Sequence, residues 1–366
     1  MPASEFNKQK SPTHFSHLPP ASIIITSYNY EKFLPRAIDS AIQQTYPVKE
    51  VIVVDDGSTD NSRHIINGYG DQITPVFKEN GGLISATNAG FLASRGEIIF
   101  FLDADDVFFP HKVETMVNYF LQVMPQTPEV LIFHRVEMTT NEGVILSIKP
   151  KKLRTLEGQK KNGLLEKLSN AEAGYRYIQK WGFLPFIASP ASGLALTRSL
   201  ASKIFPFPEQ MKRHQDILLV FCSMLLGTVY GTSQVLGSYV LQGDNLSLNA
   251  TGFQGNDDRI KIMENFLNDI LQKMNKPRII SYYDSPQAID YYRYCGSTKG
   301  LLKLTYKVPA RCFGWETIWF SIKTLWLWLK IVLGIKKGPR LTKKSRLYAQ
   351  AKKRWQGSIP SAKNRF

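Results

Sequence analysis

Cysteine is scarce in this chain, and so are the features that mark an exported or membrane-spanning protein. The three cysteines lie far apart without the paired spacing of a zinc site, which excludes a disulfide scaffold and favours a reducing, cytoplasmic compartment. Residues 1–20 are polar and lack the apolar stretch of a signal peptide, so we expect a disordered leader there. The apolar share of 43% is typical of a globular protein and argues against both a disordered chain and a membrane bundle.

Acidic residues are nearly missing from the C-terminal end. Residues 301–366 contain 16 Lys and Arg but a single acid, Glu316, so they carry a net charge of +15 out of +16 for the whole chain. Residues 1–300 are therefore close to neutral. Five of the six tryptophans also lie in this C-terminal segment. The excess positive charge thus belongs to an appendage and is no sign that the main body binds nucleic acid.

The appendage also lacks an uninterrupted apolar run. Residues 315–335 are strongly apolar, but Lys323 and Lys330 interrupt them, and two lysines near the middle are costly for a helix that crosses ~30 Å of hydrocarbon. The charged residues recur every seven positions and so form one polar stripe on a helix: Glu316, Lys323, Lys330 and Lys337. We expect residues 311–366 to lie on an anionic membrane surface as a basic, amphipathic tail; the alternative is a helix packed on the main body.

Apolar segments of strand length alternate with amphipathic segments of helical spacing after residue 20. The expected strands cover residues 22–26, 50–54, 73–77 and 98–102, and the expected helices cover 31–44, 60–67, 83–94 and 111–123. This alternation predicts an α/β protein with a mostly parallel sheet flanked by helices, which binds ligands at the carboxyl ends of its strands. Residues 150–180 are polar and basic with little β pattern, and we expect a mobile excursion there.

Acidic residues directly follow two of the expected strands. Asp55 and Asp56 come after the second strand, and Asp103 and Asp105 come after the fourth. Residues i and i+2 of an extended segment project to the same side, so Asp103 and Asp105 repel each other unless a cation lies between them. Mg²⁺ or Mn²⁺ would relieve this repulsion and keep positions open for phosphate oxygens, which points to a nucleotide diphosphate. A single Asp at such a position can instead serve only to cap the next helix.

Three segments that contain these acids resemble the glycosyltransferases of family 2, which have the GT-A fold. They are residues 22–62 (SIIITSYNY…VIVVDDGSTDNS), 79–106 (ENGGLISATNAG…FFLDADD) and 214–227 (HQDILLVFCSMLLG), and they follow in the family's order at its usual separations. The resemblance implies a Rossmann-like GT-A domain that transfers a sugar, with inversion, from a nucleotide donor such as a UDP-sugar. It implies a glycan or lipid-linked acceptor and a role in making cell-surface polysaccharide or glycolipid.

Four residues are assigned to the donor by this resemblance. Tyr28 matches the aromatic residue that stacks on the donor base, and Asp56 matches the acceptor of a hydrogen bond from the base. Asp55 is expected to fix the loop or contact the nucleotide. Asn88 lies where the family lines the nucleotide pocket. A plain loop tyrosine is the alternative for Tyr28.

The metal and the general base are assigned in the same way. Asp105 matches the main ligand of Mn²⁺ or Mg²⁺, and Asp103 matches a contact to the metal or the ribose. Asp106 is expected to cap the next segment. Asp216 matches the general base, which takes the proton of the acceptor hydroxyl. The alternative for Asp216 is an acid favoured by the dipole at the start of a helix, and Asp244 is then the next acid to consider.

The sequence departs from the family's pattern at four positions. Thr87 stands where the family often has Arg, and Gln215 stands where it usually has Glu beside the base. Val240 and Gln242 replace the Arg and His of a later Tyr-Arg-x-His segment. These changes remove two arginines and a histidine that the family has available for the diphosphate or the metal.

The resemblance also divides the chain. It predicts a nucleotide-sugar-binding half over residues 21–125, an acceptor-binding half over 126–250 and a mixed, helical extension over 251–310. Two functions of other classes are alternatives. A sugar-phosphate nucleotidyltransferase is disfavoured because residues 26–31 contain no glycine for a phosphate loop. A nucleic-acid-binding protein is disfavoured because the tail's aromatic residues share one apolar face and do not alternate with basic residues.

Within the family, a processive synthase is also disfavoured. Such an enzyme needs several spanning helices and a Gln-x-x-Arg-Trp motif, and the spacing of Gln350 from Arg354 and Trp355 misses this motif by one residue.

Overall fold

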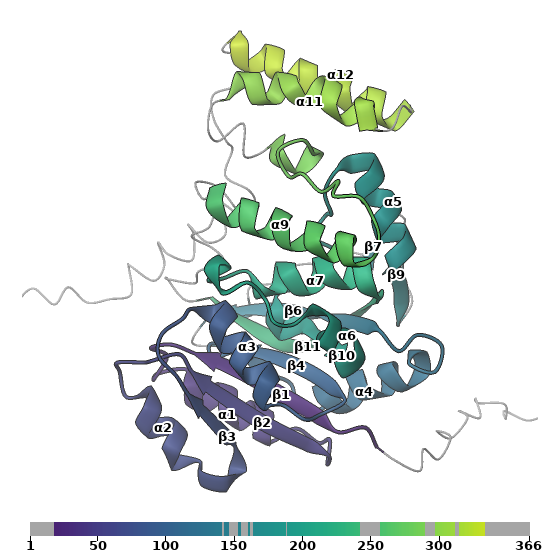
Figure 1. Cartoon of the computed structure of the whole chain (residues 1–366). Helices are drawn as coiled ribbons and strands as arrows, with labels where there is room; N and C mark the ends of the chain where they lie inside the picture. The colour runs from purple at the N-terminus through teal and green to yellow at the C-terminus, as the bar shows by residue number, and fades with distance from the viewer. Residues whose placement is uncertain are drawn as a thin grey trace, which may run out of the picture.

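The structure is a computed structural model that describes residues 18–140, 143–145, 153–154, 160–161, 164–187, 189–241, 257–289, 297–311 and 315–333. Within these ranges a mixed, nine-stranded sheet forms the centre, and helices cover both of its faces (Figure 1). The predicted α/β fold class is confirmed. The predicted leader lies almost entirely outside the described ranges.

The N-terminal half holds the parallel part of the sheet. Its strands lie in the order β3–β2–β1–β4, where β1 spans Ala21–Ser27, β2 Lys49–Asp55, β3 Thr74–Phe77 and β4 Ile98–Asp103. Each strand runs parallel to its neighbour. The apolar runs are buried on both faces: Ile23 and Ile25 of β1 join one core and Ile24 joins the other, as the twofold period of a strand requires.

Four helices alternate with these strands. They are α1 (Leu34–Ile42), α2 (Ser62–Gly68), α3 (Leu83–Ala93) and α4 (Lys112–Val123). Side chains of α1 and α4, among them Ala37 and Phe120, belong to the core on one face of the sheet, and Ile84 of α3 belongs to the core on the other. Gly90 allows α3 to approach β1 closely, because a Cβ there would lie 2.3 Å from the Ile24 side chain.

The second half continues the same sheet with mixed directions. Its strands are β5 (Val107–Phe108), β6 (Val130–Thr140), β9 (Glu166–Asn170), β10 (Leu194–Thr197) and β11 (Thr228–Leu241). β10 runs antiparallel between β4 and β6, whereas β6 and β11 pair in parallel. β5 and β9 pair antiparallel with β11. The sheet is thus parallel in its first half and mixed in its second, and it passes through both of the predicted halves.

The remaining helices stack in tiers over one side of the sheet (Figure 1). They are α5 (Ala171–Trp181), α6 (Arg198–Ile204), α7 (Gln215–Leu226), α9 (Asp257–Lys273), α11 (Thr298–Arg311) and α12 (Trp315–Val332). Short 3₁₀ turns lie at η1 (Gly70–Gln72), η2 (Ala191–Gly193), η3 (Glu209–Met211) and η4 (Pro286–Ala288), and β7 (Leu153–Arg154) pairs with β8 (Lys160–Lys161). α7 packs against α5, α6 and α9, and α11 packs against α5 and α12.

Residues 150–180 and the C-terminal tail differ in how well the structure matches their predicted organisation. The mobile excursion expected over residues 150–180 is wrong for its second part, because β9 and α5 occupy residues 166–181 and Leu168 and Ile178 join the core. The helix expected in the apolar part of the tail is confirmed as α12, and residues 334–366 lie outside the described ranges. Among the described helices none has the length and apolarity required to cross a bilayer.

Candidate functional site

The carboxyl ends of β1, β2 and β4 meet at one edge of the sheet. The register pairs Ser27 of β1 with Asp55 of β2, and Thr26 of β1 with Asp103 of β4. The residues that follow these three strands therefore start from the same level. This alignment brings the loop of Tyr28 and the two acidic segments to one edge, as the sequence predicts for a parallel sheet.

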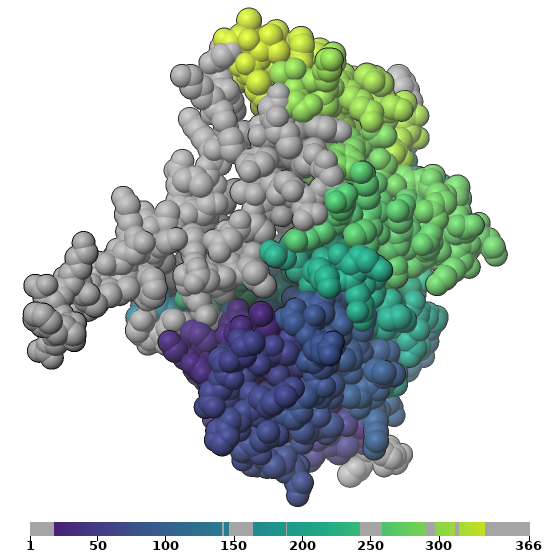
Figure 2. Space-filling model, turned by 60° about the vertical axis from the view of Figure 1, so that its left-hand side comes forward, coloured from purple at the N-terminus to yellow at the C-terminus, as the bar shows by residue number. Residues whose placement is uncertain are grey.

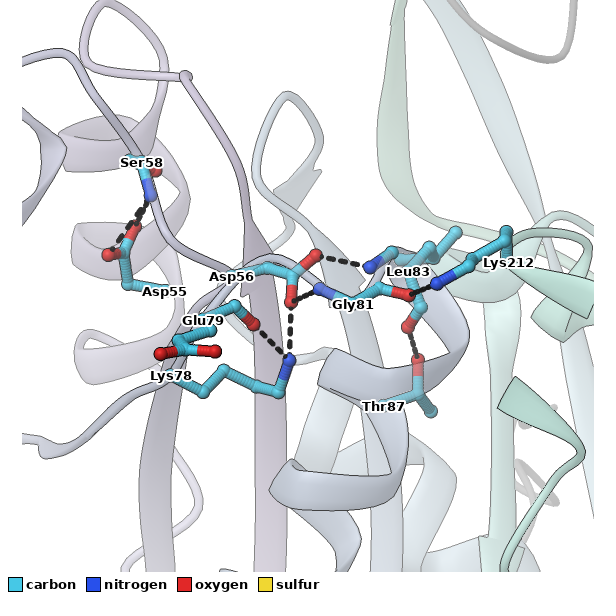
Figure 3. A network of polar contacts seen from close by, with 10 residues as sticks. Asp55, Asp56, Ser58, Lys78, Glu79, Gly81, Leu83, Thr87 and Lys212 are labelled. Carbon is cyan, nitrogen blue, oxygen red and sulfur yellow. Dashed lines mark hydrogen bonds and ion pairs between the residues drawn. The ribbon is translucent and has the colours of Figure 1, made fainter. Parts of the chain in front are cut away.

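Asp56 ties the loop after β2 to the start of α3. One carboxylate oxygen accepts hydrogen bonds from the Lys78 ammonium at 2.7 Å and the Gly81 N–H at 2.9 Å, and the other accepts from the Gly82 N–H at 2.7 Å (Figure 3). Gly82 has a φ of +91°, a conformation that L side chains rarely adopt. The buried carboxylate thus fixes the two glycines. Its predicted hydrogen bond to a donor base stays a prediction.

Asp55 points away from its neighbour and closes its own turn (Figure 3). Its fully buried carboxylate accepts from the Ser58 N–H at 3.4 and 3.3 Å, and the Arg63 guanidinium lies 3.9 Å away. This geometry gives Asp55 the first of its two predicted roles, that of fixing the loop. A contact with the nucleotide is not tested.

The loop of Tyr28 is held by backbone and side-chain contacts with the turn after β2. The Asn29 N–H donates to Ser58 Oγ at 2.9 Å, and Asn29 Oδ1 accepts from the Thr59 N–H at 2.8 Å. Asn29 has a φ of +59°, which Asn tolerates better than most residues. Tyr28 itself is 45% exposed. A fixed loop thus presents an exposed aromatic ring at the strand ends, as stacking on a base would require.

Asn88 has a structural role that the sequence did not predict. Its amide donates to the Phe207 carbonyl at 2.9 Å and accepts from the Phe207 N–H at 2.9 Å, so both functions of the side chain clamp α3 to this segment. The predicted contact with the donor stays a prediction.

Three aspartates lie within electrostatic range of one another where β4 ends and α7 begins. The pKa of Asp103 is raised to about 8, first by burial and then by the charges of Asp105 and Asp216. Burial also raises the pKa of Asp105 to about 6. Asp216 lies in the first turn of α7, more than a hundred residues further along the chain. The fold therefore brings together the predicted metal ligands and the predicted base.

Gln215 and Thr87, two of the departures from the family's pattern, contact each other. Gln215 Nε2 donates to Asp103 Oδ1 at 3.0 Å, and its Oε1 lies against the Thr87 hydroxyl, which also contacts the Leu83 carbonyl at 2.7 Å. Thr87 and Gln215 are buried. A neutral, hydrogen-bonded pair thus connects α3 to α7 and holds one oxygen of Asp103. The sequence marked both residues, but a contact across 128 positions leaves no local pattern.

Asp106 and Lys112 are two buried charged residues beside the turn that contains Asp103 and Asp105. The prediction that Asp106 caps the next segment is wrong: its carboxylate accepts from the Val240 N–H at 3.0 Å, because the turn directs it toward β11. Lys112 is fully buried; its ammonium donates to the Ser192 carbonyl at 2.7 Å and lies 3.1 Å from the centre of the Phe108 ring. Burial lowers the pKa of Lys112, while the charge of Asp106 opposes that shift. Sequence reasoning missed Lys112, since a lysine in a helix is usually solvated.

Positive charge gathers at the start of α7. His214 precedes the helix with a φ of +73°, and burial together with Arg259 and Arg213 lowers its pKa to about 4. Arg259 lies near the start of α9, which packs against α7 and η3. These arginines are cations within electrostatic range of His214, which lies two residues before Asp216. Of the two positions where the sequence lacks the family's Arg and His, Val240 is buried in β11, and Gln242 lies outside the described residues, as does Asp244.

The carboxylates fit a hard divalent cation in charge and chemistry. In the described part of the chain no group of three or more His, Cys, Asp or Glu is arranged to hold a metal ion. However, Mg²⁺ is commonly held by one or two carboxylates together with substrate phosphates. Burial raises the pKa of Asp103 and of Asp105 because it leaves their negative charges poorly solvated, and a cation between them would offset that cost.

Comparison with known proteins agrees with this geometry. The sequence profile described as glycosyl transferase family 2 matches residues 22–168. An uncharacterised glycosyltransferase of Nostoc sp. is 32% identical over 266 residues, which cover 69% of this chain and 76% of the relative. A hyaluronan synthase of Pasteurella multocida is 38% identical over 113 residues, but these cover only 30% of this chain and 12% of that enzyme.

Among solved structures, S. aureus TarS 1–349 in complex with UDP-GlcNAc is similar in fold. The TM-score is 0.53 at 15% sequence identity, and the superposition covers 92% of each chain.

Proposed function

Because the chain belongs to glycosyltransferase family 2, we propose that it transfers a sugar from a nucleotide-diphosphate donor to an acceptor hydroxyl with inversion at the anomeric carbon. The observation that carries the proposal is the meeting of Asp103, Asp105 and Asp216 at the carboxyl edge of the sheet. Two of these acids suit a metal-bound diphosphate, and the third suits an acceptor hydroxyl. The proposed donor is a UDP-sugar, in keeping with the UDP-GlcNAc bound to TarS.

The donor's nucleotide end is assigned to the loops after β1 and β2. Tyr28 would stack on the base, and the rigid turn held by Asp55 and Asp56 would supply the polar edge beside it. Arg213 and Arg259 would contact the diphosphate, whose charge suits two adjacent guanidinium groups. This arrangement would replace the cation and the histidine that the family has at positions 240 and 242.

A Mn²⁺ or Mg²⁺ ion would be held by Asp105 and Asp103, where it would stabilise the charge that develops on the leaving diphosphate. Gln215 positions Asp103 by donating to one of its oxygens, which leaves the other for the cation.

Asp216 is proposed as the general base. The acceptor oxygen would form a bond to the anomeric carbon while the bond from that carbon to the diphosphate oxygen breaks on the opposite face. The acceptor's proton would pass to the Asp216 carboxylate. A single displacement of this kind inverts the anomeric centre, and the base is needed because a sugar hydroxyl is a poor nucleophile at neutral pH.

The acceptor is proposed to be a glycan or a lipid-linked sugar in the synthesis of surface polysaccharide or glycolipid. Its support is the similarity of a 113-residue region of this chain to the P. multocida hyaluronan synthase and to the chondroitin synthase of the same species, 38% identical in each case. The matched region makes up 12% of each of those enzymes.

Thermal unfolding in the presence of nucleotides tests the donor and metal assignments. We expect UDP with Mn²⁺ to raise the Tm by several degrees, since ligand at about 100 times its Kd stabilises by about 2.7 kcal/mol. Asp105→Ala should lose the Mn²⁺-dependent part, whereas Asp71→Ala, a change at an exposed acid in η1, should keep it. Equal Mn²⁺-dependent shifts in the two variants would overturn the metal assignment.

A further inference from the structure

α12 carries a continuous row of exposed apolar side chains, here called the outer face. Trp315 is 79% exposed and Trp326 is 57% exposed, and the row recurs every three or four residues, as one face of a helix requires. It consists of Trp315, Trp319, Ile322, Trp326 and Leu329, and Leu333 continues it directly after the end of the helix. Isolated exposed apolar residues are ordinary on a protein surface, but a contiguous row marks a site of interaction.

The opposite face of α12 attaches the helix to the rest of the molecule. Thr317 and Thr324 are buried, and the Phe320 ring meets the Trp181 ring edge to face at 6.0 Å. Glu316 pairs with Lys180 of α5. Figures 1 and 2 show the α11–α12 pair at the end of the molecule opposite β2 and β3, with α12 outermost. The helix is therefore fixed with its apolar row directed away from the body.

The charges beside the outer face are positive. The Lys323 ammonium lies 5.3 Å from the centre of the Trp319 ring, and the Lys330 ammonium lies 4.9 Å from that of Trp326. The only acid in α12 is Glu316, which already has a basic partner. The sequence beyond residue 333 adds eleven Lys and Arg and no acid. An apolar, negatively charged partner therefore suits the outer face best.

We propose that the outer face of α12 lies in the interface of a membrane that contains anionic lipid. The indole rings would sit at the depth of the headgroups, and Ile322 and Leu329 would reach the upper acyl chains. The two lysines would extend to the lipid phosphates. This contact does not require a transmembrane helix, and α12 is not long and apolar enough to be one. The proposal is independent of the transfer chemistry.

Other occupants suit the outer face less well. A second copy would bring two positively charged faces together, and the basic segment after residue 333 would meet the same repulsion. A nucleic acid would use aromatic rings interleaved with basic residues, whereas these rings lie in one row with Ile and Leu.

Vesicle sedimentation of the full chain tests the proposal. The protein should pellet with vesicles of phosphatidylcholine and phosphatidylglycerol much more than with phosphatidylcholine alone, and its tryptophan emission should shift to the blue. The double variant Trp319→Ser/Trp326→Ser should bind the anionic vesicles at least about tenfold more weakly. Lys323→Glu/Lys330→Glu should also weaken binding. Leu92→Ser, at an 86% exposed site on α3, should bind like wild type.

Each contrary outcome overturns the proposal. If the Trp variant and the Leu92 variant have equal Tm values and bind vesicles equally well, the outer face does not contact the membrane. Concentration-dependent dimerisation that the Trp substitutions abolish would assign the face to a second copy. Binding of an oligonucleotide that depends on the same tryptophans, without vesicle binding, would assign it to nucleic acid.

Discussion

Asp216 is the residue at which the proposed chemistry and a merely structural role differ most clearly. An acid in the first turn of a helix is favoured by the helix dipole whatever else it does. Its place within electrostatic range of Asp103 is the additional observation that suits a base facing a metal-bound donor. The two roles predict different consequences for the same substitution.

We expect Asp216→Asn to lower turnover by about 10²–10⁴-fold, because Asn can hold a hydroxyl but cannot take its proton. The affinity for the nucleotide with Mn²⁺ should stay nearly unchanged, since the side chain keeps its shape. Turnover, donor affinity and Tm measured on one preparation test this. Near-normal transfer with a lowered Tm would leave Asp216 only a structural role.

The carboxylate group should also affect stability as a function of pH. The folded pKa of Asp103, about 8, lies above the ordinary value of 3.8, so the folded state binds this proton more tightly than the unfolded state does. Its contribution to stability is present at pH 4 and is lost as the pH rises toward 8 and beyond.

Asp103→Asn cannot ionise and so avoids the loss of stability at high pH. We therefore expect the variant's Tm in EDTA to exceed that of wild type by a few degrees at pH 8 and to match it near pH 4. Thermal unfolding across this range tests the sign. Asp71→Asn is the control, and its difference from wild type should not grow with pH. A Tm difference for Asp103→Asn that shrinks as the pH rises would contradict the electrostatic account.

Gln215 should not be replaceable by the acid that the family usually has here. Gln215→Glu removes the donor to Asp103 Oδ1 and places a second carboxylate against the first in a buried site. We expect a loss of about 1–3 kcal/mol in the free energy of unfolding at pH 8, less at pH 5. Denaturant unfolding at both pH values measures it, with the exposed Gln43→Glu as control. A neutral or stabilising effect at pH 8 would contradict the role of the Thr87–Gln215 pair.

Among the elements of the fold, α3 depends at its start on one carboxylate from the loop after β2. Asp56 holds the N–H groups of Gly81 and Gly82, which precede the helix. We expect Asp56→Ala to lower the free energy of unfolding by roughly 3 kcal/mol, because it leaves two N–H groups and the Lys78 ammonium without this acceptor. Hydrogen exchange should locate the loss in the first turn of α3. Unchanged exchange there, compared with Asp71→Ala, would show that another group fixes the turn.

Elements with a strong local pattern were predicted well. The β-branched run of residues 22–26 and the apolar run of 98–102 became β1 and β4 almost to the residue. By contrast, residues 166–181 were not recognised as β9 and α5. The solvent-facing positions of these two elements are polar. Their buried positions are covered only because β9 pairs with β11 and α5 packs on α7. The antiparallel entry of β10 beside β4 likewise depends on long-range pairing that no local pattern reports.

In the candidate site, too, features with a local sequence pattern could be predicted, and features that depend on long-range contacts could not. The acids at the strand ends were found because strand, turn and acid are consecutive in the sequence. Lys112 and the contact between Thr87 and Gln215 were not found, because they depend on which distant segments the sheet brings together. The cation assigned to Asp103 and Asp105 stays a prediction.

At the scale of the whole molecule, the chain separates two kinds of surface. The carboxylates gather at one edge of the sheet, and the apolar and basic groups gather on α12 and in the sequence beyond it. Under the two proposals, the near-neutral body would act on a nucleotide donor and the strongly basic end on a lipid surface.

We propose that this carboxylate edge of the sheet transfers a sugar from a nucleotide donor. The most direct measurement is the release of nucleoside diphosphate from a panel of nucleotide-sugars, compared between wild type and an Asp105→Ala variant that folds normally. We expect release from at least one donor; this release should require Mn²⁺ or Mg²⁺ and should fall at least about a hundredfold in the variant. Release that is equal in the two proteins, or absent with every donor although UDP and Mn²⁺ bind, would contradict the proposal.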